Sequence, residues 1–208
     1  MKRTVVAVAL AAAATFTLPA AAGATGAPPQ APKTIAAQLL SDSAGDNAQG
    51  FDRNPYDYDI VTQAVLLFPD LVAAASDPNA NLTGFLPNDR AFQVLVYDLT
   101  GNWIRSEADV FEAVKSLGAD TVKTVLTYHL VGAKIPASAA LKADGADLDT
   151  LQGGKITVRV PFRFFPLVVL QDQDPDDRNP WVVQFNYGGT LANGYLHGIS
   201  LVLRPSNL

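Results

Sequence analysis

The spacing of apolar residues changes along the chain from the period of a helix to the period of a strand. Helical spacing recurs in four segments, which are residues 57–68, 88–98, 106–117 and 120–129. From residue 155 onward apolar and polar residues alternate, as in Ile156, Val158 and Val160, which would share one face of a strand. Helices followed by strands favour an α+β fold. We expect helices in the N-terminal half to pack on a mainly antiparallel or mixed sheet from the C-terminal half.

Turn and capping residues indicate where these elements begin and end. Strands are expected at residues 81–86, 155–160, 167–171, 181–185 and 196–203. Asn88 follows the first strand and is expected to cap the helix that runs through Asp98, because its side chain can accept a hydrogen bond from the first helical turn. Pro69 should end or bend the first helix after Phe68.

One polar pair, Tyr128 and His129, interrupts the apolar run from Val125 to Val131. Apolar flanks on both sides predict that the pair is at least half buried, and buried polar tips need hydrogen-bond partners. Asn88 and Thr83 are candidate partners. The pair is therefore expected to lie where the helix at 120–129 meets the strands.

The N-terminal region has the composition of a targeting and linking segment. Lys2 and Arg3 precede an apolar stretch and then small residues at the spacing that signal peptidase cleaves, so residues 1–24 are interpreted as a signal peptide. Residues 25–50 are rich in Ala, Pro and Gly and are interpreted as a flexible spacer with a single turn of helix near residues 35–40. Residues 51–208 are then expected to form one domain.

Charge and cysteine content exclude several classes of protein. The 208 residues include 15 basic and 20 acidic side chains, a net charge of −5, with no run of Lys and Arg, which argues against a nucleic-acid partner. The sequence has no Cys, so disulfides cannot stabilise it. The apolar stretch near the N-terminus is too short for a transmembrane span. These features predict a secreted, extracellular or surface-associated protein whose stability comes from an ordinary core.

Three ordered segments resemble the fasciclin-like (FAS1) domain family. They are Asn81 to Phe92, the Tyr128-His129 pair, and Asn193 to Pro205. The resemblance implies a compact α+β wedge that is non-catalytic, usually extracellular and commonly linked to adhesion. The chain departs from the family pattern at Gly84, where a branched apolar residue is usual, and at Ser200, where an acid is usual.

The candidate site residues are Tyr128, His129, His197 and Asn88, either as an interaction motif or as structural residues. The resemblance implies that the Tyr-His pair contributes to adhesive contact, whereas its apolar flanks favour a structural role. No catalytic, cofactor-binding or metal-binding residues are predicted. The two histidines are too few for a zinc site without Cys, and no G-x-S-x-G segment is present for a hydrolase.

Three further segments carry hypotheses of their own. In the acidic segment 171–180, Asp172, Asp174 and Asp176 alternate as calcium ligands do. A solvated turn is the simpler interpretation, because Asp177 stands where a calcium loop needs Gly and Val183 stands where it needs Glu. The aromatic segment 162–170 is either core or an exposed apolar patch. The tetrapeptide D-R-N-P followed by an aromatic residue occurs at 52–56 and 177–181, which is interpreted as common turn chemistry and not as a duplication.

The sequence therefore predicts a secreted adhesion or protein-interaction module that binds a cell-surface or matrix protein and has no enzymatic activity. The alternative is an extracellular carrier that binds an apolar small molecule in a cleft lined by residues 162–170. The identity of the partner and the oligomeric state remain open at this stage.

Overall fold

The computed structural model describes residues 31–43, 50–162 and 164–207. The predicted signal peptide and much of the predicted spacer lie outside these residues. The helices are α1 Ile35–Asp42, α2 Asp59–Leu66, α3 Pro69–Ser76, α4 Asp89–Thr100, α5 Glu107–Lys115, α6 Ala119–Tyr128 and α7 Ala137–Ala140. The strands are β1 Leu82–Pro87, β2 Leu130–Val131, β3 Asp147–Asp149, β4 Lys155–Arg159, β5 Val169–Gln171, β6 Val182–Gln184 and β7 Gly194–Ile199.

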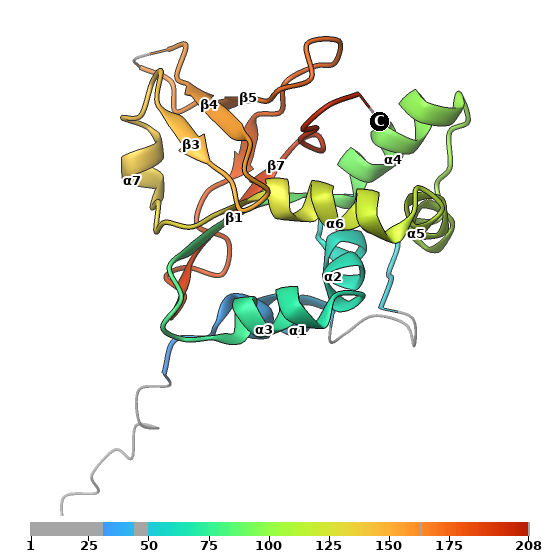
Figure 1. Cartoon of the computed structure of the whole chain (residues 1–208), viewed down its shortest axis with the longest axis horizontal. Coiled ribbons are helices and arrows are strands. Elements are labelled where there is room, and N and C mark those ends of the chain that lie inside the picture. The colour runs from blue at the N-terminus through green and yellow to red at the C-terminus, as the bar shows by residue number, and fades with distance from the viewer. Residues whose placement is uncertain (1–30, 44–49, 163, 208) are drawn as a thin grey trace, which may run out of the picture. The chain divides into compact units, whose positions relative to one another are not determined.

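The strands form two sheets. The larger has the order β2-β1-β7-β6, and the smaller has the order β3-β4-β5. The β1–β7 pair is parallel and every other pair is antiparallel. The smaller sheet and α7 lie at the upper left of Figure 1, with α1 to α6 below and to the right. The α+β prediction is confirmed, but the strands divide between two sheets, and β1 comes from the helical half of the chain.

The parallel pair β1–β7 lies at the centre of the larger sheet. Its register runs from Leu82 opposite Gly194 to Pro87 opposite Ile199. A side chain at Gly194 would overlap the backbone of Leu82, so only glycine fits there. Gly84 leaves room for Leu196, because a Cβ at Gly84 would lie 2.9 Å from the Leu196 Cδ2 atom. The departure at Gly84 is therefore compensated by a large neighbour on the adjacent strand.

Helix α1 corrects the predicted spacer. Ile35, Ala36 and Leu39 are buried in the core, and the compact unit begins at Ala31. The buried side chain of Asn193 holds this helix: its Oδ1 accepts from the Ile35 N–H at 2.9 Å, and its Nδ2 donates to the Ala75 carbonyl at 2.8 Å. The turn of helix expected near residues 35–40 is present, but residues 31–43 are part of the compact unit and not a flexible spacer. Three apolar side chains on one face of a short helix suffice when a distant amide anchors it.

Pro69 separates α2 from α3, as expected. It occupies the first turn of α3, where a missing N–H costs nothing. No single helix in the described part of the chain is long and apolar enough to cross a membrane; α2 and α3 reach that length and hydropathy only as a pair bent by 109°.

Two apolar clusters fill the interior. One packs α1 to α6 against the larger sheet and includes Ile60, Phe92 and Leu196. The other joins the two sheets and includes Phe85, Tyr128 and Leu170. Tyr128 thus belongs to the cluster between the sheets, although it is the last residue of a helix.

We expect Gly194→Ala to destabilise the domain by about 1–3 kcal/mol or more, because the added methyl group must displace the β1 backbone. The matched control is Gly132→Ala, where the new Cβ would only touch the Leu151 side chain at 3.6 Å. Urea unfolding of both variants measures the difference. Equal midpoints for the two variants would contradict the tight β1–β7 approach.

Candidate functional site

Tyr128 links α6 to the smaller sheet. Its side chain is fully buried, and its hydroxyl donates to the Lys155 carbonyl at 2.6 Å. Burial raises the pKa of this phenol to about 12. The hydroxyl therefore remains protonated and serves to join the end of a helix to the start of β4.

His129 links α6 to the C-terminal segment of the chain. The ring is buried; Nδ1 lies 2.7 Å from the Val125 carbonyl, and Nε2 accepts from the Leu203 N–H at 2.9 Å. Because the Leu203 N–H can only donate, Nε2 must be the unprotonated nitrogen and Nδ1–H donates to Val125. Burial lowers the pKa of His129 to about 4, so the ring is neutral at pH 7.

The partners proposed for this pair from the sequence are wrong. The Asn88 Oδ1 atom accepts from the Ala91 N–H at 3.0 Å and caps α4. The Thr83 hydroxyl donates to the Ala133 carbonyl at 2.6 Å and accepts from the Ile135 N–H at 2.9 Å. Asn88 and Thr83 are thus already bonded to backbone groups. Tyr128 bonds to the Lys155 carbonyl instead, and His129 accepts from the Leu203 N–H.

His197 occupies an inner position of β7. Its Nε2 atom lies 2.8 Å from the Ile135 carbonyl, and its Nδ1 atom accepts from the Asn186 N–H at 3.2 Å. The ring lies between Phe85 and Phe185, with centroid distances of 5.9 and 5.7 Å. Burial lowers its pKa. Both ring nitrogens of each histidine are thus engaged by backbone groups, so binding a metal would require breaking these bonds.

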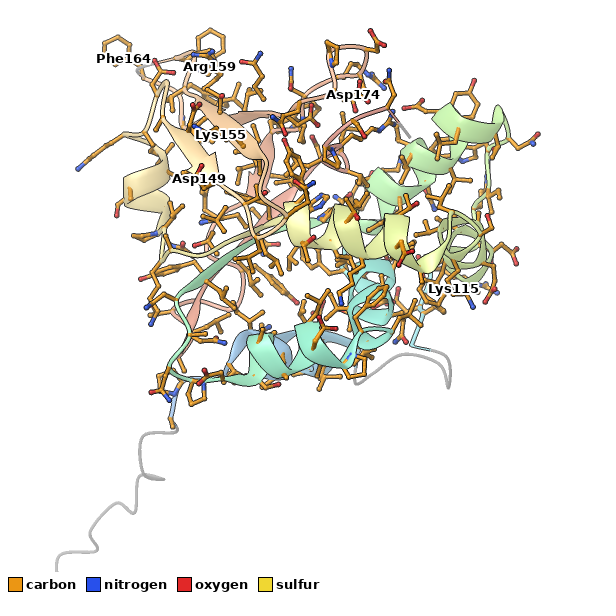
Figure 2. The ribbon with its side chains drawn as sticks, viewed as in Figure 1. Lys115, Asp149, Lys155, Arg159, Phe164 and Asp174 are labelled. Carbon is orange, nitrogen blue, oxygen red and sulfur yellow. The ribbon has the colours of Figure 1, made fainter. Side chains whose placement is uncertain are left out.

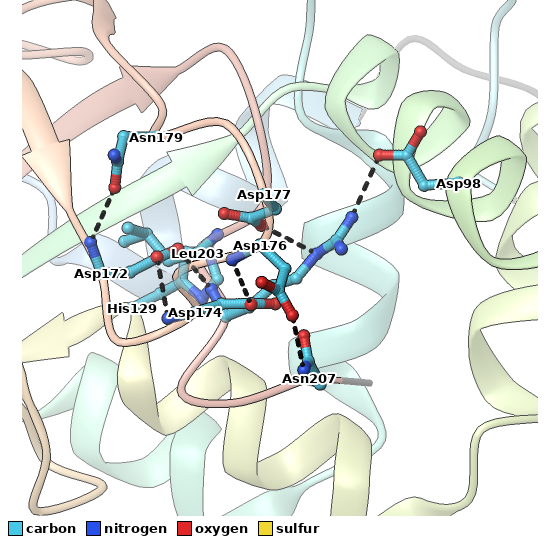
Figure 3. Close-up of polar contacts among 10 residues, drawn as sticks. Asp98, His129, Asp172, Asp174, Asp176, Asp177, Asn179, Leu203 and Asn207 are labelled. Carbon is cyan, nitrogen blue, oxygen red and sulfur yellow. Dashed lines mark hydrogen bonds and ion pairs between the residues drawn. The ribbon is translucent and has the colours of Figure 1, made fainter.

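The C-terminal segment that His129 holds is also bound by the acidic loop 171–180 (Figure 3). The Arg204 N–H donates to Asp172 Oδ2 at 2.9 Å. The Arg204 guanidinium pairs with Asp177 at 3.1 Å and with Asp98 of α4 at 3.2 Å. The loop therefore fastens the end of the chain to α4.

Two carboxylates of this loop also accept hydrogen bonds from its own backbone. Asp172 Oδ1 accepts from the Asp174 N–H at 3.2 Å, and Asp174 Oδ1 accepts from the Asp176 N–H at 3.1 Å. Groups of acids whose ligand atoms converge do occur among the described residues, but none of them includes Asp172, Asp174 or Asp176. This geometry favours the turn interpretation of the segment over the calcium hypothesis.

A buried acid cluster is present that the sequence did not predict. Asp59, Asp89 and Glu107 are each the first residue of a helix, and their carboxylate oxygens lie within 4.8 Å of one another. Their exposures are 1%, 0% and 3%. Asp89 Oδ1 accepts from the Ile60 N–H at 2.9 Å, and Glu107 Oε2 accepts from the Arg53 N–H at 3.0 Å. The available signal was an acid at the start of three separate helices.

The positive ends of three helix dipoles explain how these acids are buried together. Negative charge is stabilised at a helix N-terminus. Burial, together with a hydrogen bond to Asp57, raises the pKa of Asp89, which is the protonated partner of this pair. Burial also raises the pKa of Asp57 to about 6. Carboxylates at this spacing suit a hard cation, and Asp52, Asp57 and Asp59 form a second such group. In the buried cluster, however, the helix N-termini and the proton on Asp89 already compensate the negative charge.

An exposed aromatic tip lies between β4 and β5. Phe162, Phe164 and Phe165 are 57%, 102% and 63% exposed. Figure 2 shows Phe164 at the outer edge of the molecule, near Arg159. The sequence left two interpretations of segment 162–170, and the structure divides it: Val168 and Leu170 are core, and the three phenylalanines are surface.

The fold and motifs agree with a comparison against family models, in which the fasciclin domain matches residues 59–205. The chain belongs to the fasciclin domain family. Among solved structures, the FAS1 domain pair of the insect cell adhesion molecule fasciclin I matches with a TM-score of 0.56 and 18% identity. That match covers 83% of this chain and 51% of the other, so the chain spans about half the length of that structure. No curated protein gives a significant match.

We expect this fasciclin domain to lose stability in acid through His129. Its pKa is about 4 in the folded protein and 6.5 in the unfolded chain. Its contribution to the free energy of unfolding is therefore complete above pH 6.5 and is lost as the pH falls toward 4. Linkage gives a loss of about 3 kcal/mol. His129→Gln removes the titrating group, and the wild type should weaken relative to it between pH 7 and 4.5 in urea unfolding. A constant difference would refute the neutral buried imidazole.

Asp57 is expected to act in the opposite direction. Because its pKa is raised to about 6 in the folded protein, ionisation of Asp57 lowers the free energy of unfolding as the pH rises from 4 to 7. Asp57→Asn should therefore gain stability relative to the wild type over this range. The thermal unfolding midpoints of both proteins at pH 4, 5.5 and 7 provide the measurement, and Asp120→Asn on the exposed start of α6 is the control.

Proposed function

We propose that this chain is a secreted, non-catalytic adhesion or protein-interaction module that binds a cell-surface or matrix protein. Fasciclin domains are commonly adhesion or interaction modules and are usually extracellular, and the signal-like N-terminal sequence supports export. The acidic, Cys-free composition is consistent with this role.

The observation that carries the proposal is the aromatic tip formed by Phe162, Phe164 and Phe165. The Tyr-His pair has its polar atoms turned inward and offers almost no surface to a partner. The tip, in contrast, presents three large apolar side chains to solvent on the hairpin between β4 and β5. Burying one phenylalanine contributes roughly 1.5–3 kcal/mol, and aromatic anchors of this kind dominate protein interfaces.

The surroundings of the tip also suit a protein partner. Lys142, Asp144 and Arg159 are exposed beside it and provide charges of both signs. A polar rim around an aromatic centre is the usual composition of a protein–protein contact. The geometry thus favours docking through the tip, with the rim charges setting orientation.

The carrier alternative depends on the groove behind the tip. This groove holds about 520 Å³ and is lined by Leu141, Val160 and the three phenylalanines, among others. Small-molecule sites bury most of their ligand, whereas Phe164 here is wholly exposed. The open form favours a macromolecular partner. A lipid-like molecule that co-purifies with the protein in native mass spectrometry would support the carrier instead.

Cell attachment to surfaces coated with the mature protein tests the proposal. Replacing Phe162, Phe164 and Phe165 together with Ser should reduce attachment about tenfold or more, because the aromatic anchors are lost. Leu67→Ser removes another exposed apolar side chain, 46% exposed, and should leave attachment unchanged.

Tyr128→Phe separates the tip from the motif within the same assay. It removes the hydroxyl that bonds to Lys155 at a cost of about 1 kcal/mol in stability, and attachment should be retained. Attachment that survives loss of the phenylalanines but fails in folded Tyr128→Phe protein would assign adhesion to the motif and overturn the proposal.

A further inference from the structure

A second groove lies on a different surface, where the start of α4 meets β6 and the residues after β7. It holds about 530 Å³ and is lined by side chains from segments far apart in the sequence. Tyr56, Arg90, Arg178 and Trp181 are the large side chains that line it. None of them belongs to the aromatic tip, so the two surfaces can be tested separately.

The two D-R-N-P segments meet at this groove. The first ends in Tyr56, which is 71% exposed, and the second ends in Trp181, which is 47% exposed. Their local structures differ: the Tyr56 N–H donates to Asn54, whereas the Trp181 N–H donates to Ser200. The shared tetrapeptide is therefore not a structural repeat, but each copy places an aromatic ring at the same groove.

The backbone of Trp181 is bonded to Ser200, in the segment that follows β7. Its N–H donates to the Ser200 hydroxyl at 3.1 Å, and the Ser200 N–H returns a bond to the Trp181 carbonyl at 3.0 Å. A register shift in β6 directly follows, between Val182 and Gln184. Ser200 thus stands where the family usually has an acid, and the serine both holds the tryptophan and removes a negative charge from the groove.

The charge of the groove is opposite to that of the chain. Its lining includes Arg90 and Arg178 and no Asp or Glu, in a protein whose net charge is −5. Arg90 stacks over Trp103 at 4.3 Å from the ring centroid and donates to Gln93 at 3.2 Å. Within the described part of the chain, neither arginine forms an ion pair with a carboxylate. Both guanidinium groups thus keep a positive charge that no neighbouring carboxylate neutralises, although Arg90 is also held by Trp103 and Gln93.

Polar groups on the floor complete the groove. The Tyr58 hydroxyl donates to Gln184 Oε1 at 2.7 Å, which orients this amide beneath the aromatic rings. The space for Tyr58 exists because Gly198 of β7 has no side chain; a Cβ there would overlap the phenol. The groove therefore combines aromatic side chains, an amide held by a buried hydroxyl, and two cations.

We propose that this groove binds an acidic oligosaccharide whose sugar units carry carboxylates. Flat aromatic side chains pack against the C–H faces of sugar rings, and arginine binds carboxylates through paired N–H groups. The Gln184 amide, whose oxygen accepts from Tyr58, keeps its NH2 group for a sugar hydroxyl. Two arginines are too few for nucleic acid, where affinity rests on many phosphate contacts. An acidic peptide shares the charge but not the ring faces that Tyr56 and Trp181 fit.

Titration of the mature protein with tetragalacturonate tests this inference by calorimetry at low ionic strength. We expect saturable binding that weakens about tenfold in Arg178→Gln and in Trp181→Ala, because each removes one of the recognising groups. Higher salt should weaken binding, since the carboxylate contacts are exposed. Arg105→Gln is the matched control: it also removes one exposed arginine, outside both the groove and the aromatic tip, and should bind as the wild type does.

Three outcomes would overturn the inference. The first is equal binding of a neutral tetrasaccharide, which would remove the role of the arginines. The second is tighter binding of a tetraglutamate peptide, which would assign the groove to acidic peptides. The third is an equal loss in Arg105→Gln and Arg178→Gln, which would reduce the effect to net charge. Cell attachment through the aromatic tip is measured independently, so failure here leaves that proposal untouched.

Discussion

The parallel pairing of β1 with β7 is the constraint on which the rest of the fold depends. It joins residues 82–87 to residues 194–199 in a single register, and Gly194 permits an approach that no other residue allows. The entropy lost in closing the long loop between β1 and β7 must be offset by the contacts along this strand pair, called the seam below. Asn193 lies at one end of the seam and anchors α1 and α3, while Asn88 lies at the other and starts α4. The positions of α1, α3 and α4 thus depend on one strand pair.

A second constraint is electrostatic. Three helices begin at one buried point, and each begins with an acid. Buried carboxylates repel one another, but the helix dipoles, the backbone N–H groups of Ile60 and Arg53, and the proton on Asp89 offset that repulsion. The cluster fixes how α2, α4 and α5 converge. The acid cluster therefore constrains the arrangement of these three helices, as Gly194 constrains the pairing of β1 with β7.

Local spacing in the sequence was sufficient to predict much of the fold. It placed β1, the Asn88 cap and the burial of Tyr128, because each depends on neighbours within one or two turns of chain. It indicated a turn of helix near residues 35–40 but not that α1 packs into the core, because the contact that anchors α1 comes from Asn193 near the opposite end of the domain. It also failed for the partners of His129, since nothing near this residue in sequence indicates that Leu203 donates to it.

The two candidate binding surfaces also could be predicted only in part from the sequence. Segment 162–170 was recognisable as aromatic, but exposure distinguishes a core strand from a tip, and exposure is a property of the whole fold. The groove of Tyr56 and Trp181 could not be foreseen, because it unites two segments that meet only after the sheet has formed. The sequence shows both copies of the tetrapeptide, but it does not show that the aromatic residues following them line the same groove.

The short outer strands of the sheets have a consequence for how copies of this domain meet each other. In the larger sheet β2 has two residues and β6 has three with a shifted register, and both outer strands of the smaller sheet have three residues. Long, flat edges invite other chains to add strands and aggregate. These edges offer little backbone for that purpose. A domain crowded on a surface can therefore make contacts through side chains without its sheets fusing into fibres.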